Sequence, residues 1–293
     1  VRSRRQRQMC IRDSNGLIWS NWLVFLCLGA GAYFTLVTLF LQIRCLPDMI
    51  RQLKSGEKSE EGISSFQSLM ISLAGRVGVG NIAGVATAIA FGGPGAVFWM
   101  WLVALLGSAT SFIECCLAQI YKETDRDTGE YRGGPAYYIE KAYKHTTAAP
   151  FMLVYAIIFA ICMLLATSYF LPGIQANGVA AAVDNAWGID VKISAAVMAI
   201  LLAFIIIGGV KRIANFASMV VPFMAAIYII IAIVVLFANA SDIPEVFGVI
   251  FRSAFDKEAA FSGMLGAAIM WGVKRGIYSN EAGQGTGPVS YTH

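Results

Sequence analysis

Residues 80–84 read Gly-Asn-Ile-Ala-Gly, and residues 279–283 read Ser-Asn-Glu-Ala-Gly. Each stretch places Asn-x-Ala-Gly inside an otherwise apolar run, with other glycines close by. A helix that crosses lipid cannot leave peptide groups unpaired, so it unwinds only where the freed groups face protein, water or a ligand. Interruptions at corresponding positions in two halves of a chain mark binding sites in membrane proteins built from internal repeats. The two stretches therefore predict two unwound helices that share a binding site inside a membrane.

Composition places the whole chain in the membrane class. Of the 293 residues, 57% are hydrophobic and only 14% are charged, and the mean hydropathy is +0.65. These values lie far from those of an average soluble domain, and the charges gather between long apolar runs. The predicted fold class is therefore an all-α, polytopic membrane protein in contact with membrane lipid. No nucleic-acid partner is expected.

Few side chains are available for enzyme chemistry. The chain has six cysteines and only two histidines, His145 and His293. No cysteine pair has zinc-ligand spacing with a histidine nearby, so neither a disulfide framework nor an imidazole metal site is expected. The Gly78-x-Gly80-x-x-Ala83 spacing matches a loose dinucleotide fingerprint, but that motif needs a preceding strand and a later acidic residue, and both are missing. The sequence predicts no catalytic residues and a protein that is not an enzyme.

The two ends of the chain differ from the rest. Residues 1–14 contain five arginines and, like residues 289–293, look like translated adapter sequence. We expect a non-native arm at 1–14, a transmembrane domain at 15–288 and a non-native tail at 289–293. A basic arm that lies on a membrane surface is the alternative for residues 1–14.

Seven segments have the apolar character of a membrane span, for which about 20 residues are needed. They cover approximately residues 17–43 (A), 65–91 (B), 94–121 (C), 151–183 (D), 193–207 (E), 214–238 (F) and a segment from 259 onward (G). Segment D is long enough to be tilted, or bent at Pro172-Gly173. Only Gly92-Gly93 joins B to C, which predicts a tight hairpin.

Loop charges predict the orientation of the segments. The A–B, C–D and E–F connections carry eleven Lys and Arg residues, whereas the opposite connections carry three. The positive-inside rule places the A–B, C–D and E–F loops in the cytoplasm, and we expect the cell inner (plasma) membrane as the location. Five tryptophans fall at the outer ends of the segments, where an interfacial aromatic belt belongs, although they would equally suit gaps between helices. They are Trp19, Trp22, Trp99, Trp101 and Trp187.

The interruption in segment B predicts a substrate site and a cation site. Glycines let the backbone unwind, and Asn81 is expected to cap a second half-helix whose positive end attracts a carboxylate. Carbonyl groups freed near Val77 and Gly78, together with Asn81, are oxygen donors suited to a small cation. The alternative is that the glycines only allow close helix packing. The predicted substrate contacts in this segment are Val79, Gly80, Asn81 and Gly84.

The interruption in segment G offers a second set of ligands. Ser279 and Asn280 supply side-chain oxygens, and Gly283 belongs to the stretch expected to unwind. All three are predicted substrate contacts. Gln175, a polar residue inside segment D, is predicted to line the same cavity.

Charged residues inside a membrane are expensive and therefore candidates for function. Lys274, Arg275 and Glu281 are candidates for an internal gate or for pairing with one another. Alternatively, Lys274 and Arg275 pair structurally with Glu114 or Asp184.

Several longer motifs resemble one known family. They cover residues 66–69, 80–89, 92–101, 131–138, 175–177, 222–224 and 275–283. Over residues 15–288 the chain is similar to the alanine/glycine:cation symporter (sodium:alanine symporter) family, and it resembles an N-terminal fragment of such a protein. The resemblance implies a LeuT-like fold of five-plus-five inverted repeats with one extra N-terminal helix. The chain would then be truncated after the first repeat and one helix of the second.

The resemblance also implies site residues. Members of the family carry alanine, glycine or related neutral amino acids, driven by sodium. The sequence departs from the usual pattern at Val79, Gln284 and Thr286, where Thr, an apolar residue and Ser are commoner. By motif, the family's site falls on Gly80, Asn81, Gly84, Ser279, Asn280 and Gly283.

The predicted function is sodium-coupled symport of a small neutral amino acid, such as alanine or glycine, into the cell by alternating access. Na+ is the expected coupling ion. The alternative is proton coupling on the same fold, with the proton carried by Glu114, Asp184 or Glu281. An intramembrane enzyme or a channel is a less favoured alternative.

Overall fold

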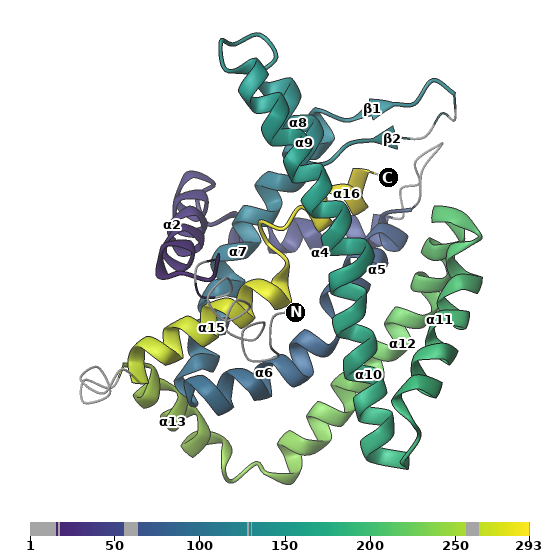
Figure 1. Ribbon diagram of the computed structural model, residues 1–293. Coiled ribbons are helices and arrows are strands. Elements are labelled where there is room, and N and C mark those ends of the chain that lie inside the picture. Colours follow the sequence, from purple (N-terminus) through teal and green to yellow (C-terminus); the bar gives the residue numbers. More distant parts are fainter. Residues whose placement is uncertain are drawn as a thin grey trace, which may run out of the picture.

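A computed structural model describes residue 16 and residues 18–55, 64–127, 129, 131–255 and 264–292, and it is helical almost throughout (Figure 1). Two short strands, β1 (Glu123–Thr124) and β2 (Tyr131–Arg132), pair antiparallel in a connecting hairpin. The all-α prediction is confirmed. The helices are α2 (Asn21–Val37), α3 (Leu41–Arg44), α4 (Leu46–Ser55), α5 (Ser65–Arg76), α6 (Val79–Gly92), α7 (Gly95–Ile120), α8 (Pro135–Ala142), α9 (Ala149–Leu165), η1 (Ala166–Phe170), α10 (Leu171–Trp187), α11 (Val191–Ile206), α12 (Gly209–Ala238), α13 (Ile243–Phe255), α15 (Met264–Asn280) and α16 (Thr286–Thr292).

Within the described residues, four helical regions are long and apolar enough to cross a membrane. They correspond to segments B, C, D and F, and they span Ser65–Gly92, Gly95–Ile120, Ala149–Trp187 and Arg212–Ala238. The apolar helices α2 and α11 are shorter.

Segment A is shorter than the sequence predicts. Helix α2 ends at Val37, and Leu39 and Phe40 then have positive φ angles of 53° and 55° before α3 and α4 follow. Residues 1–14, where a non-native arm is expected, and residues 259–263 at the start of segment G lie outside the described residues. The expected tail at 289–293 is described as far as residue 292, which ends α16.

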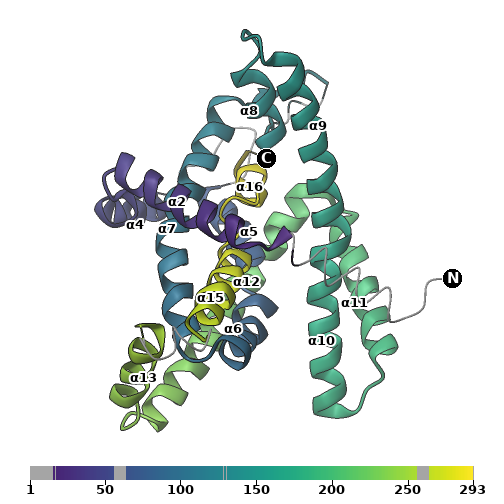
Figure 2. The ribbon, with the colours of Figure 1, turned by 60° about the vertical axis from the view of Figure 1, so that its left-hand side comes forward.

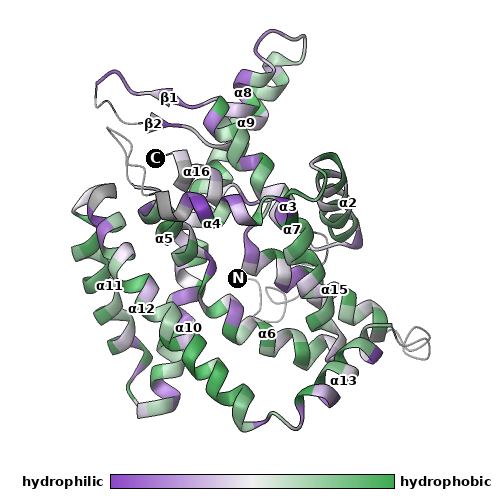
Figure 3. Cartoon of the chain, turned by 180° about the vertical axis from the view of Figure 1, so that it is seen from behind, coloured by the Kyte–Doolittle hydropathy of each residue, from purple (hydrophilic) through white to green (hydrophobic). Residues whose placement is uncertain are grey.

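The connections of the later segments alternate between the two ends of the molecule, as a series of membrane spans requires. The C–D connection, with β1, β2 and α8, lies at the upper end of the views in Figures 1 and 2. The turn between α10 and α11 and the helix α13 lie at the lower end. Hydrophobic residues dominate α10, α11 and α12, whereas hydrophilic residues gather on the hairpin and nearby parts of α8 (Figure 3). Which end is cytoplasmic stays a prediction from the loop charges.

The start of α5 is fixed by a capping box. The backbone N–H of Gln67 donates a hydrogen bond to Ser64 Oγ (3.2 Å), and the backbone N–H of Ser64 donates one to Gln67 Oε1 (3.0 Å). Gln67 Nε2 also donates to Asn215 Oδ1 of α12 at 2.8 Å, and Met70 of α5 packs against Val221 of α12. These contacts attach the first half of segment B to α12.

Helix α15 lies against α7 through glycines spaced four residues apart. A Cβ added at Gly272 would lie 2.5 Å from the Ala96 carbonyl oxygen, and one at Gly276 would lie 3.1 Å from Cβ of Val103. Small residues at this spacing let two helix backbones approach closely, as they do in many membrane helix pairs. The close approach sets the position of the residues that follow α15.

We expect Gly272→Ala to destabilise the protein and Gly266→Ala to leave its stability unchanged or slightly raised. A Cβ at residue 272 has no room beside Ala96, so the two helices must move apart, at a cost of about 1–3 kcal/mol. Gly266 lies on the same helix with nothing within 4 Å of an added Cβ, so alanine there brings only its better helix propensity. Thermal unfolding of the two full-length variants in detergent measures the difference. Equal melting temperatures would contradict the close α7–α15 contact.

Candidate functional site

Segment B is interrupted between α5 and α6, as predicted. Helix α5 ends at Arg76 and α6 begins at Val79, and the two residues between them are extended, with φ/ψ of −99°/104° at Val77 and −169°/−156° at Gly78. Gly78 takes the N-cap position of α6, so the prediction that Asn81 caps the half-helix is wrong. Asn81 lies in the first turn of α6 because the helix resumes earlier than the motif suggests.

Segment G is interrupted between α15 and α16. Helix α15 ends at Asn280 and α16 begins at Thr286, and between them Glu281, Gly283 and Gly285 have positive φ angles of 55°, 83° and 80°. Glycine takes such angles without steric cost, whereas a residue with a Cβ does so at a cost of roughly 1–2 kcal/mol. The strained backbone at Glu281 is of the kind that clusters at functional sites.

Segment D contributes a third irregularity, the π-helix η1 (Ala166–Phe170) between α9 and α10. Single π-turns inside long helices occur frequently at functional sites. The sequence predicts that segment D is either tilted or bent at Pro172-Gly173, and the π-turn lies just before this pair. Thr167 of the π-turn and Pro172 both line the cavity described next.

The three irregular segments border one cavity of about 380 Å³. This volume lies within the ~300–1,000 Å³ typical of ligand pockets. The cavity brings together predicted site residues from three segments that are far apart in the sequence. They are Val77, Gly78, Gly80, Asn81, Gln175 and Ser279.

The two breaks contact each other directly. Ser279 Oγ donates a hydrogen bond to the carbonyl oxygen of Gly80 at 3.2 Å. A Cβ at Gly80 would lie 2.9 Å from the ring of Tyr278, so only glycine permits this approach. The last turn of α15 is thus joined to the first turn of α6 by a side-chain hydrogen bond next to both breaks.

Helix α10 meets the first break through Gln175. The Val79 amide, the first of α6, donates to Gln175 Oε1 at 3.0 Å. The N-terminus of a helix carries unpaired amides and a partial positive charge. Gln175 therefore marks an acceptor position that a carboxylate oxygen would also suit. Its long-range pairing with Val79 could not be read from the sequence.

Asn81 bridges the first break and leaves one oxygen unpaired. Its Nδ2 donates to the Arg76 carbonyl at 2.8 Å, which satisfies a peptide oxygen freed at the end of α5. Its Oδ1 is buried and has no hydrogen-bond partner among the described residues, and the same holds for the hydroxyl of Tyr278. Buried polar atoms are rarely left unpaired, so these two atoms indicate room for a ligand. Tyr278 is not among the residues predicted from the sequence, although its place next to Ser279 is a usable signal.

Asn280 points away from the cavity, toward α7. Its Nδ2 donates to the Val103 carbonyl at 3.2 Å, and its Oδ1 accepts from the Ala282 amide at 2.8 Å. Gly107 of α7 makes room for this side chain, since a Cβ there would lie 2.5 Å from Asn280 Nδ2. The Asn280 side chain thus attaches the end of α15 to α7. Asn280 does not line the cavity, so its predicted contact with the substrate is not seen in this structure.

Gly84 and Gly283 also lie outside the cavity lining. The Gly283 amide donates to Glu114 Oε2 of α7 at 2.9 Å. A Cβ at Gly84 would lie 3.8 Å from Cδ of Arg275. Both glycines shape contacts between helices, and their role as substrate ligands stays a prediction.

The cations of α15 are directed to aromatic rings. Lys274 Nζ lies 6.0 Å from the ring centre of Trp19, and Arg275 Cζ lies 5.7 Å from that of Trp271. Within the described part of the chain, the ion pairs lie in the C–D connection instead. Among the described residues, the alternative in which Lys274 and Arg275 pair with Glu114 or Asp184 is not found, and each cation lies near a ring as in a cation–π contact. The alternative gating role of these cations stays a prediction.

Comparison with known proteins identifies close relatives. The sequence profile of the sodium:alanine symporter family matches residues 4–292. YrbD of Bacillus subtilis is 53% identical over 278 residues, which cover 95% of this chain and 56% of that protein. The sodium/alanine symporter AgcS of Methanococcus maripaludis is 43% identical over 283 residues, covering 96% of this chain and 62% of AgcS. A sodium/proton-dependent alanine carrier protein of Bacillus sp. strain PS3 is 46% identical over 241 residues, covering 82% of this chain and 52% of the carrier.

The chain spans little more than half the length of these relatives. The family match nevertheless extends over nearly all of the sequence. The chain belongs to the sodium:alanine symporter family, whose members are transporters and not enzymes.

Proposed function

We propose that the complete protein carries a small neutral amino acid, such as alanine or glycine, into the cell together with sodium. The observation that carries this proposal is the contact of two interrupted helices at one cavity, which peptide groups, neutral polar side chains and the charged Arg76 and Glu281 line. The names of two relatives, a sodium/alanine symporter and a sodium/proton-dependent alanine carrier, support it. A zwitterion and a small cation both suit exposed peptide groups at the ends of half-helices.

In this proposal the substrate carboxylate binds at the N-terminus of α6. The amides of the first turn, from Val79 to Asn81, lie at the positive end of the helix dipole and favour an anion. Gln175 places an amide group beside the same end, with Oε1 3.0 Å from the Val79 nitrogen. When this amide turns, its Nε2 donates to the carboxylate and the Val79 amide becomes free to do the same.

The substrate ammonium group then faces the second break. Ser279 Oγ and the Tyr278 hydroxyl supply neutral oxygen acceptors on that side of the cavity. The Tyr278 hydroxyl is buried without a partner in the described part of the chain, so its oxygen is available to accept a hydrogen bond from the ammonium group. The small side chain of alanine fits beside Leu171 and Pro172, which supply the apolar part of the lining.

Sodium binds, in the same proposal, beside the extended residues between α5 and α6. The donors are the carbonyl oxygens of Val77 and Gly78 and the unpaired Oδ1 of Asn81. The described residues contain no group of three or more His, Cys, Asp or Glu that could hold a metal ion. The three donors proposed for sodium are neutral oxygens, which suit a monovalent ion better than a divalent one.

Alternating access would expose this site first to the outside and then to the cytoplasm, where we place the A–B, C–D and E–F loops. At ~100 mV, the entry of one sodium ion contributes about 2.3 kcal/mol. A tenfold sodium gradient adds roughly 1.4 kcal/mol. Together these terms would concentrate alanine on the order of several hundredfold, which is enough for uptake against a gradient.

Proton coupling on the same fold is the second candidate, and two carboxylates favour it. Glu114 accepts a hydrogen bond from the second break, and Glu281 lies within that break and lines the cavity. Asp184, the third acid considered, is exposed on α10 and does not line the cavity. A relative named as a sodium/proton-dependent carrier supports keeping this candidate.

Uptake of labelled alanine by the full-length protein in proteoliposomes tests the proposal. We expect accumulation under an inward sodium gradient, and a fall of at least tenfold when choline replaces sodium, because the site then lacks its cation. Empty liposomes give the background. Uptake that persists in choline and collapses with a protonophore would instead support proton coupling, and equilibration without accumulation would support a channel.

Gln175→Leu should raise the KM for alanine about tenfold to a hundredfold. The substitution removes a polar partner of the α6 N-terminus and of a charged carboxylate, a loss of about 1.5–3 kcal/mol. Asn177→Leu is the matched control, since Asn177 lies two residues further along α10, is exposed and does not line the cavity. Initial rates of uptake over a range of alanine concentrations measure both variants. If the two variants have the same KM, Gln175 has no part in substrate binding.

A further inference from the structure

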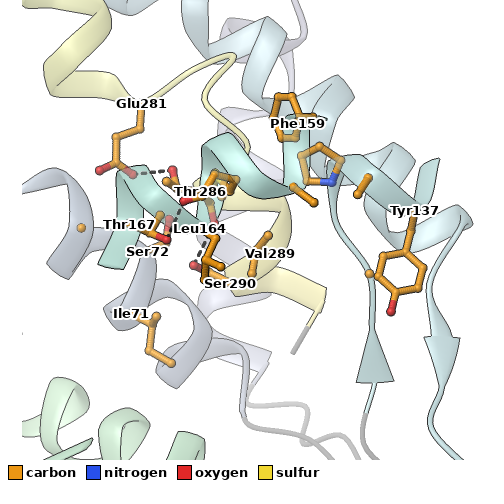
Figure 4. Close-up of a pocket in the computed structure, with 17 residues that line it drawn as sticks. Ile71, Ser72, Tyr137, Phe159, Leu164, Thr167, Glu281, Thr286, Val289 and Ser290 are labelled. Carbon is orange, nitrogen blue, oxygen red and sulfur yellow. Dashed lines mark hydrogen bonds between the residues drawn. The ribbon is translucent and has the colours of Figure 1, made fainter. Parts of the chain in front are cut away.

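Cavities also occur outside the central site. One of about 540 Å³ lies beside the second break, with Glu281 and Thr286 at one side and Tyr137 at the other (Figure 4). It belongs to the surroundings of the site already described. Another, of about 780 Å³, lies between α4 and the helices α5 and α7. None of its described lining residues lines the central cavity, so this cavity needs an explanation of its own.

A strained turn leads from α2 into α3 and α4. Leu39 and Phe40 have positive φ angles of 53° and 55°, which residues with a Cβ adopt only at a cost. Side chains hold the turn in place: Thr38 Oγ1 donates to the Phe34 carbonyl at 2.7 Å, and Arg44 Nη2 donates to the Thr38 carbonyl at 3.4 Å. In the view of Figure 2, α4 lies at the left margin of the molecule.

Helix α4 turns its polar face toward the protein and its apolar face outward. Asp48, Arg51 and Gln52 line the cavity. Leu46 and Ile50 do not line it, and they are 53% and 49% exposed. In water this orientation would be unfavourable, because it exposes apolar side chains while charged ones face the protein. The outward face of α4 therefore suits an apolar surrounding.

The acyl chains of membrane lipid are a surrounding of this kind. The outward face of α4 continues the exposed apolar surface at the end of α2, which consists of Leu36, Val37, Leu39, Phe40 and Ile43. Helix α2 belongs to the predicted membrane span A, so this surface is expected to face lipid. Amphipathic helices with basic residues lie in the membrane interface, with the apolar face against the acyl chains.

The charge of the same segment favours an anionic headgroup. Residues 41–55 contain Arg44, Arg51 and Lys54 but a single acid, Asp48. Basic residues next to a membrane span attract the anionic lipids of the cytoplasmic leaflet, and the A–B loop is predicted to lie on that side. Arg51 makes no hydrogen bond or ion pair with another described residue, so its guanidinium is available to a phosphate group.

We propose that α3 and α4 form a binding site for an anionic phospholipid of the cytoplasmic leaflet. Arg51 follows Ile50 directly and so lies at the boundary between the two faces of α4. The acyl chains lie along Leu46 and Ile50, and the phosphate binds Arg51 at the mouth of the cavity. Ser65, the first residue of α5, lines the same cavity, so bound lipid stabilises the start of segment B. The inference does not depend on which solute the protein carries.

A lipid titration of the full-length protein in neutral detergent tests the headgroup. We expect phosphatidylglycerol to raise the melting temperature and phosphatidylcholine to leave it unchanged. Arg51→Gln should weaken the apparent affinity for phosphatidylglycerol about fivefold, the contribution of one basic residue near an anionic surface. Lys144→Gln is the matched control, since Lys144 is an exposed basic residue of the C–D connection, and it should bind like wild type. Equal responses to the two lipids, or equal affinities of the two variants, would overturn the anionic site.

A fluorescent label on the outward face tests what covers it. Ile50→Cys is labelled in a full-length protein without other cysteines and placed in phosphatidylglycerol vesicles. We expect quenching by lipid with brominated acyl chains to exceed quenching by aqueous iodide about threefold or more. Asp48→Cys, on the cavity side of the same helix, is the control and should show the weaker lipid quenching. Stronger quenching by iodide at residue 50 would place this face in water. Quenching by neither would mean that the rest of the full-length chain or a second copy covers it. Either result would overturn the inference, whether or not the protein carries alanine with sodium.

Discussion

Peptide groups freed inside a membrane must find partners within the protein, and this constraint shapes the whole arrangement. Each break in this chain is paired with something outside its own helix. At the first break, Asn81 Nδ2 donates a hydrogen bond to the Arg76 carbonyl, and the Val79 amide donates one to Gln175 of α10. Next to the second break, Ser279 Oγ donates a hydrogen bond to the Gly80 carbonyl of α6. Within the second break, the Gly283 amide donates one to Glu114 of α7. These hydrogen bonds join the two interrupted helices to each other and to α7 and α10 around the cavity.

The last two residues of α15, just before the second break, make hydrogen bonds to different helices. Ser279 faces the first break, and Asn280, one position later at the end of α15, faces α7. Successive residues of a helix point about 100° apart, so a short motif cannot direct all its polar side chains to one cavity. The close glycine contacts between α15 and α7 decide which residue faces which way. Packing along the helix therefore determines the composition of the site several residues away.

The sequence predicts both breaks and six of the residues that line the central cavity, because clustered glycines with an asparagine inside an apolar run favour an interrupted helix. It misplaced the start of α6, since several glycines permit unwinding and only tertiary contacts choose among them. The roles of Asn280 and Gly283 could not be read from the motif, because their partners lie on α7, which is remote in the sequence. The π-turn gave no sequence signal beyond the nearby Pro172.

Charge is distributed unevenly over the proposed site, and this bears on coupling. The groups assigned to sodium and to the substrate carboxylate, at Val77, Gly78, Asn81 and Gln175, are all neutral. A bare cation or a bare carboxylate bound there would be poorly compensated in a medium of low dielectric. Bound together they compensate each other, so occupancy by one favours occupancy by the other. In the proposed mechanism, coupling thus arises from this mutual compensation of the two ligands, beside two charged residues of the cavity lining, Arg76 at the end of α5 and Glu281 in the second break.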